Sequence, residues 1–152
     1  MTPAIKLLEK HQILFEVLQF KHIETSVNFA NEAAEQLCLK PETVFKTIVI
    51  NVDGVLHIAI LPSTNKVDLK AYAKACKGKR AELADAQLAQ SSTGYVIGGI
   101  SPFAQKKRLK TLLHHSAKHH SHVYVSAGRR GLEVKVSPRD IVRMCGANFA
   151  TF

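Results

Sequence analysis

The chain has 152 residues, 46% of them hydrophobic and 22% charged, a composition typical of one globular domain with its own core. Its apolar runs fall far short of a bilayer span, its start lacks a signal peptide, and its three cysteines form no close pair, which excludes a membrane protein, a disulfide scaffold and a zinc ribbon. The formal net charge of +9 favours a polyanionic partner, with nucleic acid as the leading class, although many basic proteins bind none.

The first forty residues predict a helix, a strand and a second helix. Thr2 followed by Pro3 is typical of a helix start, and this helix should run to about Lys10. LFEVLQF, residues 14–20, predicts a strand. Asn28 can cap a second helix, which should end before Pro41.

The clearest signal in the chain is a β-hairpin. VFKTIVI, residues 44–50, and VLHIAIL, residues 55–61, flank an Asp53-Gly54 turn, a dipeptide that favours tight hairpin connections. Both strands are apolar on both faces, so we expect the hairpin to lie in the middle of a sheet.

The remaining segments predict short elements. In chain order they are a helix over 68–77 closed by a left-handed Gly78, a strand over 80–83, a helix over 85–91, strands within KTLLHH and HVYVS, a strand over 131–137, and a helix from Pro138 to about Met144 closed by Gly146. About six strands and four or five helices without regular alternation predict an α+β fold. We expect a single domain over 1–152 with a mixed, largely antiparallel, barrel-like sheet flanked by short helices.

Lys46 is the first candidate site residue, because it shares a strand face with Ile48 and Ile50 in an otherwise apolar strand. Two interpretations are open. The lysine can pack its stem and extend its ammonium group into water. Alternatively it lies in a cleft, where a partly desolvated ammonium group can bind a phosphate or an ester carbonyl.

Two glycine-containing segments are the next candidates. In TGYVIGGISPF, Gly94, Gly98 and Gly99 permit backbone conformations in which N–H groups converge on an anion, although the segment is also compatible with a plain tight connection. VSAGRRGLEV places flexible backbone beside Arg129 and Arg130, which can bind phosphate or simply form a basic turn. Neither segment carries a P-loop or a dinucleotide-binding pattern.

Other chemistries are poorly supported. Five histidines lie between residues 114 and 122, but no HExxH pattern accompanies them, so we expect no metal site. The GxSxG pattern of serine hydrolases is also absent. The chain therefore offers no protein nucleophile.

FKT, STGYVIGGISP followed by QKKR, and VSAGRRGLEV occur in this order, and with them the chain resembles the YbaK/EbsC family of prolyl-tRNA-synthetase-associated editing domains. The resemblance covers nearly the whole chain. It implies a mixed, barrel-like α/β fold and hydrolysis of misacylated tRNA(Pro).

The resemblance also implies site residues. The essential lysine of the family falls on Lys46, and its catalytic glycine-rich loop on Gly98 and Gly99. At position 20 the family often has tyrosine, whereas this chain has Phe20, which can form a pocket wall but lacks the hydroxyl group. Glu133 receives no assigned role. The implied substrate-binding residues are Phe20, Phe29, Thr47, Ile100, Ser101, Ser126, Gly128 and Arg129.

We therefore expect a cytoplasmic trans-editing hydrolase that deacylates mischarged Cys-tRNA(Pro), with the cysteinyl thiol of the substrate attacking its own ester. No metal or cofactor is expected, and prolyl-tRNA synthetase is an expected partner of the tRNA-bound protein. Two alternatives are open. One is a deacylase for Ala-tRNA(Pro) or another small aminoacyl group, because pocket size decides between them. The other is a non-catalytic module that binds tRNA or a synthetase.

Overall fold

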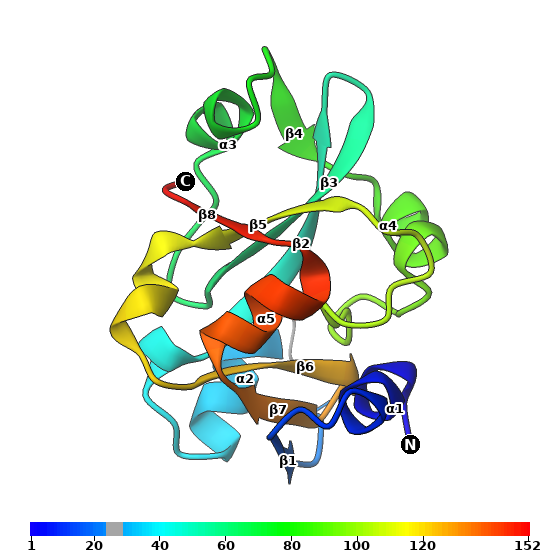
Figure 1. The fold of residues 1–152 in the computed structure, drawn as a ribbon, viewed down its shortest axis with the longest axis vertical. Helices are drawn as coiled ribbons and strands as arrows, with labels where there is room; N and C mark the ends of the chain where they lie inside the picture. Colours follow the sequence, from blue (N-terminus) through cyan, green and yellow to red (C-terminus); the bar gives the residue numbers. More distant parts are fainter. Residues whose placement is uncertain (24–28) are drawn as a thin grey trace.

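The computed structural model describes residues 1–23 and 29–152, which form two β-sheets with helices packed around them (Figure 1). The three-stranded sheet has the order β1-β7-β6, with β1 at Glu16–Gln19, β7 at Leu132–Val136 and β6 at Val123–Arg129. The five-stranded sheet has the order β4-β2-β3-β5-β8, with bounds Ala81–Leu83, Phe45–Val52, Val55–Pro62, Lys110–His114 and Asn148–Ala150.

Five α-helices complete the described part of the chain, together with two short 3-10 helices at Pro41–Thr43 and His115–His119. The α-helices α1 to α5 cover Pro3–Lys10, Phe29–Gln36, Leu69–Ala75, Ala86–Thr93 and Pro138–Cys145. No described helix has the length and apolar character needed to cross a membrane.

The predicted α+β class and the mixed, largely antiparallel pairing are confirmed. Among the described strands, β5 pairs in parallel with β3 and β8, and the other pairs are antiparallel. The strands form two sheets rather than one curled sheet. These sheets come together where Val44, just before β2, bridges to Tyr124 of β6.

The predicted hairpin is confirmed as β2 and β3, which occupy the second and third positions of the five-stranded sheet. Asp53 and Gly54 both adopt positive φ, 51° and 86°, as a two-residue hairpin turn requires. The hairpin buries apolar side chains on both faces. Phe45, Val49, Ile58 and Ile60 belong to the main core, whereas Ile50, Ala59 and Leu61 pack with Tyr72 of α3.

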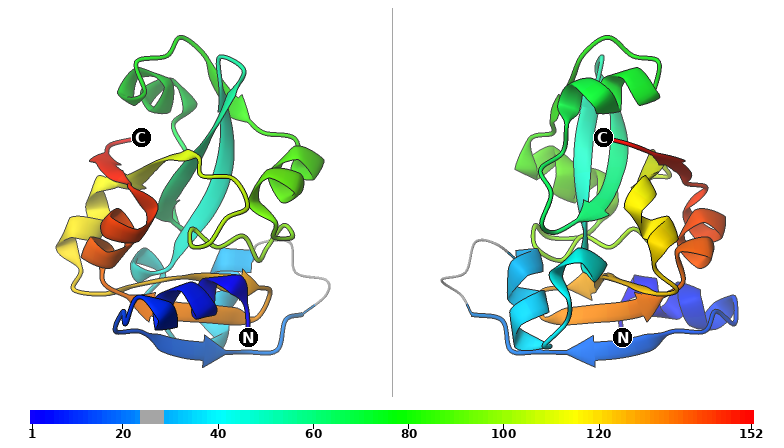
Figure 2. Two further views of the ribbon diagram at one scale, coloured as in Figure 1. Left: turned by 45° about the vertical axis from the view of Figure 1, so that its right-hand side comes forward. Right: turned by 90° about the vertical axis from the view of Figure 1, so that its left-hand side faces the viewer.

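Both ends of the chain pack onto this framework. In α1, Thr2 caps the helix by accepting a hydrogen bond from the Ile5 N–H at 3.2 Å, and Leu8 is buried in the main core. Figure 2 shows α1 beside β6 and β7, whereas the C-terminus lies near the five-stranded sheet. In α3, the Tyr72 hydroxyl donates to the Ile58 carbonyl at 2.6 Å.

The structure differs from the predicted elements at the end of α3 and near the C-terminus. The left-handed helix end predicted at Gly78 is wrong, because Lys77 adopts that conformation with φ 59°. Glycine is needed at 78 for a different reason: a Cβ there would lie 2.5 Å from Val52 Cγ1. The short strand β8 was not predicted, and the predicted cap Asn28 lies outside the described residues.

Gly131 fixes the end of β1 against the β6–β7 turn. Its carbonyl accepts a hydrogen bond from the Phe20 N–H at 2.9 Å, its φ is 83°, and a Cβ would lie 2.5 Å from the Phe20 carbonyl oxygen. Gly131→Ala should therefore lower the free energy of unfolding by about 2–4 kcal/mol. Gly54→Ala is the matched control, because its φ is similar but its Cβ would meet open space, and it should cost about 1 kcal/mol. Urea unfolding measures both, and equal losses would contradict the steric argument.

Candidate functional site

A cavity of about 520 Å³ lies between the edge of β2 and the three-stranded sheet. It is closed by the start of α2, by α4 and by the glycine-rich loop that follows α4. Its lining residues are Phe29, Phe45, Lys46, Thr47, Ile48, Val49, Ala89, Ile97, Gly98, Ile100, Ser126 and Glu133.

The cavity follows an open edge of β2. β4 pairs with β2 over Ile50–Val52, and the Ala84 N–H just after β4 donates to the Val49 carbonyl at 3.0 Å, so the edge from Phe45 to Ile48 has no neighbouring strand among the described elements. Alternation along a strand directs Lys46 and Thr47 to opposite faces. Both nevertheless line the cavity, because a cavity at an open edge contacts both faces.

Lys46 is a half-buried cation in this cavity. Burial lowers the pKa of its ammonium group, and the nearby charge of Lys66 lowers it further. Among the described residues, no carboxylate forms an ion pair with Lys46. A desolvated, unpaired ammonium group is suited to an anionic or strongly polar ligand.

Thr47 contributes a buried hydroxyl group. Its Oγ1 has no hydrogen-bond partner in the described part of the chain. A buried hydroxyl without a partner typically costs about 1–3 kcal/mol. This atom is shielded from solvent, so Thr47 lines the cavity through its other atoms.

The glycine-rich loop packs against its surroundings through backbone atoms. Gly98 has φ 88°, and a Cβ there would lie 2.8 Å from the Phe29 ring and 2.9 Å from Arg130 Nε. At Gly99 a Cβ would lie 2.9 Å from the backbone of Arg129 and Arg130. Both positions therefore require glycine for close approach, and Gly98 requires it also for its backbone conformation.

The two glycines differ in what their N–H groups can do. The Gly99 N–H donates to the Val96 carbonyl at 2.9 Å, so it is not free to bind an oxyanion in this conformation. The expectation that Gly98 and Gly99 both act as donors therefore needs correction for Gly99. No hydrogen bond among the described residues occupies the Gly98 N–H.

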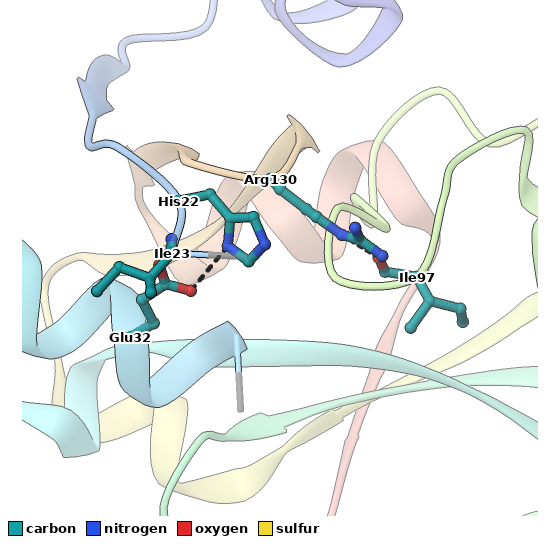
Figure 3. A network of polar contacts seen from close by, with 5 residues as sticks. All are labelled: His22, Ile23, Glu32, Ile97 and Arg130. Atoms are coloured by element: carbon teal, nitrogen blue, oxygen red, sulfur yellow. Dashed lines mark hydrogen bonds and ion pairs between the residues drawn. The ribbon is translucent and has the colours of Figure 1, made fainter. Parts of the chain in front are cut away.

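Arg130 joins the glycine-rich loop to the β6–β7 turn (Figure 3). Its Nε donates to the Ile97 carbonyl at 2.8 Å, and its guanidinium carbon lies 4.9 Å from the centre of the Phe29 ring. Glu32 accepts a hydrogen bond from the Ile23 N–H at 2.6 Å and contacts His22 Nδ1 at 2.9 Å, which anchors residues 22 and 23 to α2. Arg129, the arginine that was predicted to bind substrate, has no such contact with the loop, and both arginines are exposed and outside the cavity lining.

Three further predicted substrate-binding residues lie outside the cavity lining. Phe20 packs against a small buried cluster beneath α2. Ser101 is fully buried, and its Oγ accepts a hydrogen bond from the Phe103 N–H at 3.2 Å. The Gly128 N–H donates to Ser126 Oγ at 3.1 Å, so Gly128 orients the side chain of a lining residue without lining the cavity itself.

Glu133 is the cavity residue to which the sequence analysis assigned no role. It lies in β7, opposite Leu18 and Ser126 in the neighbouring strands, and is 8% exposed. Burial raises the pKa of its carboxyl group to about 8, with no hydrogen bond or opposite charge to offset it. Glu133 and Lys46 are the two ionisable residues of the lining.

The histidine-rich stretch forms no metal centre in the part of the chain that is described. His115 and His119 stack edge to face on the 3-10 helix, with ring centres 5.8 Å apart. No group of three or more histidine, cysteine, aspartate or glutamate residues is placed to hold a metal ion among the residues described.

Comparison with known proteins gives matches over nearly the whole chain. The family model of the aminoacyl-tRNA editing domain matches residues 24–144. A protein of Enterococcus faecalis (strain ATCC 700802 / V583), named "Putative Cys-tRNA(Pro)/Cys-tRNA(Cys) deacylase EbsC", is 32% identical over 151 residues, which cover 98% of this chain and 91% of that protein.

Solved structures share the fold. The hypothetical protein APE2540 superimposes with a TM-score of 0.88 at 20% identity, over 99% of this chain and 98% of that chain. A structure described as a "putative trans-editing enzyme for prolyl tRNA synthetase" superimposes with a TM-score of 0.83 at 20% identity, over 99% and 96% of the two chains.

Because the carboxyl group of Glu133 is buried, we expect the stability of the folded chain to depend on pH. Its pKa in the folded chain, about 8, exceeds its ordinary value of 4.5, so the folded state binds the proton more tightly than the unfolded chain. The stability that the folded chain gains from this tighter proton binding is fully present below pH 4.5 and is lost as the pH rises through 8. Glu133→Gln should therefore melt near the wild-type temperature at pH 5 but about 4 °C higher at pH 8.

Thermal unfolding followed by circular dichroism at the two pH values measures this effect. The matched control is Glu16→Gln, an exposed glutamate on β1 of the same sheet, which should shift neither midpoint. If Glu133→Gln shifts the melting temperature by the same amount at pH 5 and at pH 8, the prediction is contradicted.

Proposed function

The chain belongs to the aminoacyl-tRNA editing domain family and is an aminoacyl-tRNA deacylase, and we propose that its substrate is mischarged Cys-tRNA(Pro). The observation that carries the proposal is the cavity at the open edge of β2, in which Lys46 lies half-buried and unpaired beside a glycine-rich wall. The curated relative named as a cysteinyl-tRNA deacylase supports the choice of aminoacyl group. Residues 1–152 act as one cytoplasmic editing domain without a metal or cofactor.

In this proposal the protein positions the substrate and stabilises charge. Lys46 binds the 3′-terminal phosphate or polarises the ester, and the Gly98 N–H donates to the developing oxyanion. Thr47 forms part of the cavity wall beside Lys46. Phe29, stacked by Arg130, forms the wall at the start of α2, where the terminal adenosine enters.

The lining residues do not support a nucleophile of the protein. They include no histidine or cysteine, and the two hydroxyl groups, of Thr47 and Ser126, are not paired with a general base. Activation of a serine or threonine requires such a base within hydrogen-bond reach. The nucleophile is therefore either water or a group of the substrate, and in this proposal it is a group of the substrate.

The cysteinyl thiol is well placed to be that nucleophile. Its sulfur attacks the ester carbonyl carbon and gives up its proton to solvent, and the oxyanion forms beside Gly98. The bond between the carbonyl carbon and the ribose oxygen then breaks, and that oxygen takes up a proton. The products are a cyclic thioester of cysteine, which water hydrolyses, and tRNA with a free terminal hydroxyl.

The cavity itself discriminates only weakly between small side chains. Val49, Ala89, Ile97 and Ile100 give it an apolar lining, and one methylene group in such a pocket typically changes the rate by only about 10- to 200-fold. An alanyl group fits the same space. Selection of cysteine must then rest on the reactivity of its thiol.

We further propose that tRNA(Pro) is delivered by prolyl-tRNA synthetase. The cavity accommodates the aminoacyl end, and the net charge of +9 attracts tRNA without reading its sequence. Recruitment by the synthetase raises the local concentration of the mischarged tRNA at the deacylase. A protein of the same fold is described as a "putative trans-editing enzyme for prolyl tRNA synthetase", and this description supports the proposal.

Deacylation of Cys-tRNA(Pro) and Ala-tRNA(Pro) tests the function and the role of Lys46. Wild type should hydrolyse the cysteinyl ester, and Lys46→Ala should be about 100- to 1,000-fold slower, as is typical when one electrostatic group of an active site is removed. Lys70→Ala, an exposed lysine on α3, is the control and should retain wild-type activity. A Lys46→Ala protein with more than half of the normal rate would overturn the assignment, and binding of tRNA without hydrolysis would favour the non-catalytic alternative.

The thiol mechanism makes a separate prediction. Seryl-tRNA(Pro) carries a near-isosteric side chain with a far weaker nucleophile, so its hydrolysis should be at least about 100-fold slower than that of the cysteinyl ester. Initial rates measured under the same conditions give the ratio. Comparable rates for the cysteinyl, seryl and alanyl esters would show that water or a ribose hydroxyl attacks, and would favour the broader deacylase.

A further inference from the structure

Glu133 is a buried carboxyl group that the mechanism above does not use. It is 8% exposed, lies in the middle strand of the three-stranded sheet and lines the same cavity as Lys46. No ion pair in the described part of the chain involves its carboxyl group. A buried acid without a partner is unfavourable, and such groups are retained where a ligand completes them.

The other buried acid of the described residues provides a contrast. Glu32 lies at 5% exposure in α2, but its oxygens already interact with His22 and with the Ile23 N–H. Glu32 therefore anchors the chain, and it does not line the cavity. Glu133 is the lining residue that can accept a cation.

Every unblocked aminoacyl ester brings such a cation. Its α-ammonium nitrogen lies two bonds from the carbonyl carbon, so it must enter the cavity with the ester. Lys46 repels it, because both groups are positively charged. The remaining ionisable group of the lining, Glu133, attracts it.

We propose that Glu133 binds the α-ammonium group of the aminoacyl ester and so makes a free α-amino group a requirement for deacylation. The inference rests on the proposed function, because it names a further feature that the site recognises in its substrate. Lys46 and Glu133 then bind the two ends of the reacting unit, the ester or phosphate side and the amino side. This arrangement fixes the carbonyl between them.

Electrostatics support the pairing. Burial alone raises the pKa of the Glu133 carboxyl group, because the charged form lacks solvent and a partner. An ammonium group in hydrogen-bond contact supplies the missing partner and favours the carboxylate. Binding of the amino group therefore completes an ion pair that the empty cavity lacks.

The requirement has a consequence for selectivity. An N-blocked ester, including the peptidyl-tRNA of translation, has no α-ammonium group and places an amide beside a buried acid. Such a substrate leaves Glu133 unpaired and adds bulk to the cavity. The deacylase should therefore spare peptidyl-tRNA even when its last residue is cysteine.

The test compares two esters of tRNA(Pro) that share the thiol. One carries cysteine, and the other carries 3-mercaptopropionate, which lacks only the α-amino group and forms the corresponding cyclic thioester. Wild type should prefer the cysteinyl ester by about 100-fold or more, as is typical of a site built around a polar group. Glu133→Gln should reduce this preference to less than about fivefold, chiefly by slowing hydrolysis of the cysteinyl ester.

Two controls separate recognition from structure. Glu16→Gln, on the exposed edge of the same sheet, should keep the wild-type preference. Glu133→Asp keeps the charge on a shorter side chain and should retain part of the preference, which also covers the case in which Glu133→Gln fails to fold. N-acetylcysteinyl-tRNA(Pro) should be hydrolysed by wild type no faster than the mercaptopropionyl ester.

The outcomes distinguish the inference from the function on which it rests. Equal wild-type rates for the cysteinyl and mercaptopropionyl esters would overturn the role of Glu133 and leave the deacylase intact. An unchanged preference in a folded Glu133→Gln would do the same. Failure of wild type to hydrolyse the cysteinyl ester would overturn the proposed function, and the role of Glu133 with it.

Discussion

The open edge of β2 between Phe45 and Ile48 is the constraint on which the cavity depends. A central strand normally has its backbone groups paired on both sides, but on this side the pairing ends at Val49, whose carbonyl accepts from the Ala84 N–H. The space that another strand would fill is enclosed by the start of α2, the glycine-rich loop and the three-stranded sheet. Side chains from both faces of β2 can therefore reach one cavity, which a fully paired strand would not allow.

The wall opposite this edge is held by close backbone approach. Gly98 and Gly99 let the loop pack directly on the β6–β7 turn, and Arg130 ties that turn back to the Ile97 carbonyl. The Gly99 N–H closes the loop internally, whereas the N–H of the lining residue Gly98 has no hydrogen-bond partner among the described residues. A donor fixed in this way needs no rearrangement when charge develops, which is the basis of electrostatic catalysis.

Residues that contradict their local pattern were visible in the sequence, whereas contacts between distant segments were not. Asp53-Gly54 separates two apolar strands and Lys46 lies within one of them, so the hairpin, which the structure confirms, and the candidate Lys46 were visible from residue types alone. Glu133 was not, because the alternation of LEVKV is equally typical of a strand with one solvated face. Its burial depends on the cavity beside β7. Likewise, Arg129 and Arg130 are equivalent in sequence, and only the geometry of the turn selects Arg130.

A lysine and a buried carboxyl group share one largely apolar cavity, an arrangement that suits the proposed reaction without a protein nucleophile. Lys46 and Glu133 each lose solvation, and each lacks a partner among the described residues, so both gain most from a ligand that carries complementary charges. An aminoacyl ester at the end of tRNA carries both, a phosphate and an ammonium group, with the reacting carbonyl between them. Apart from Thr47 and Ser126, the rest of the lining is apolar, so the electrostatic binding of such a substrate is concentrated on Lys46 and Glu133.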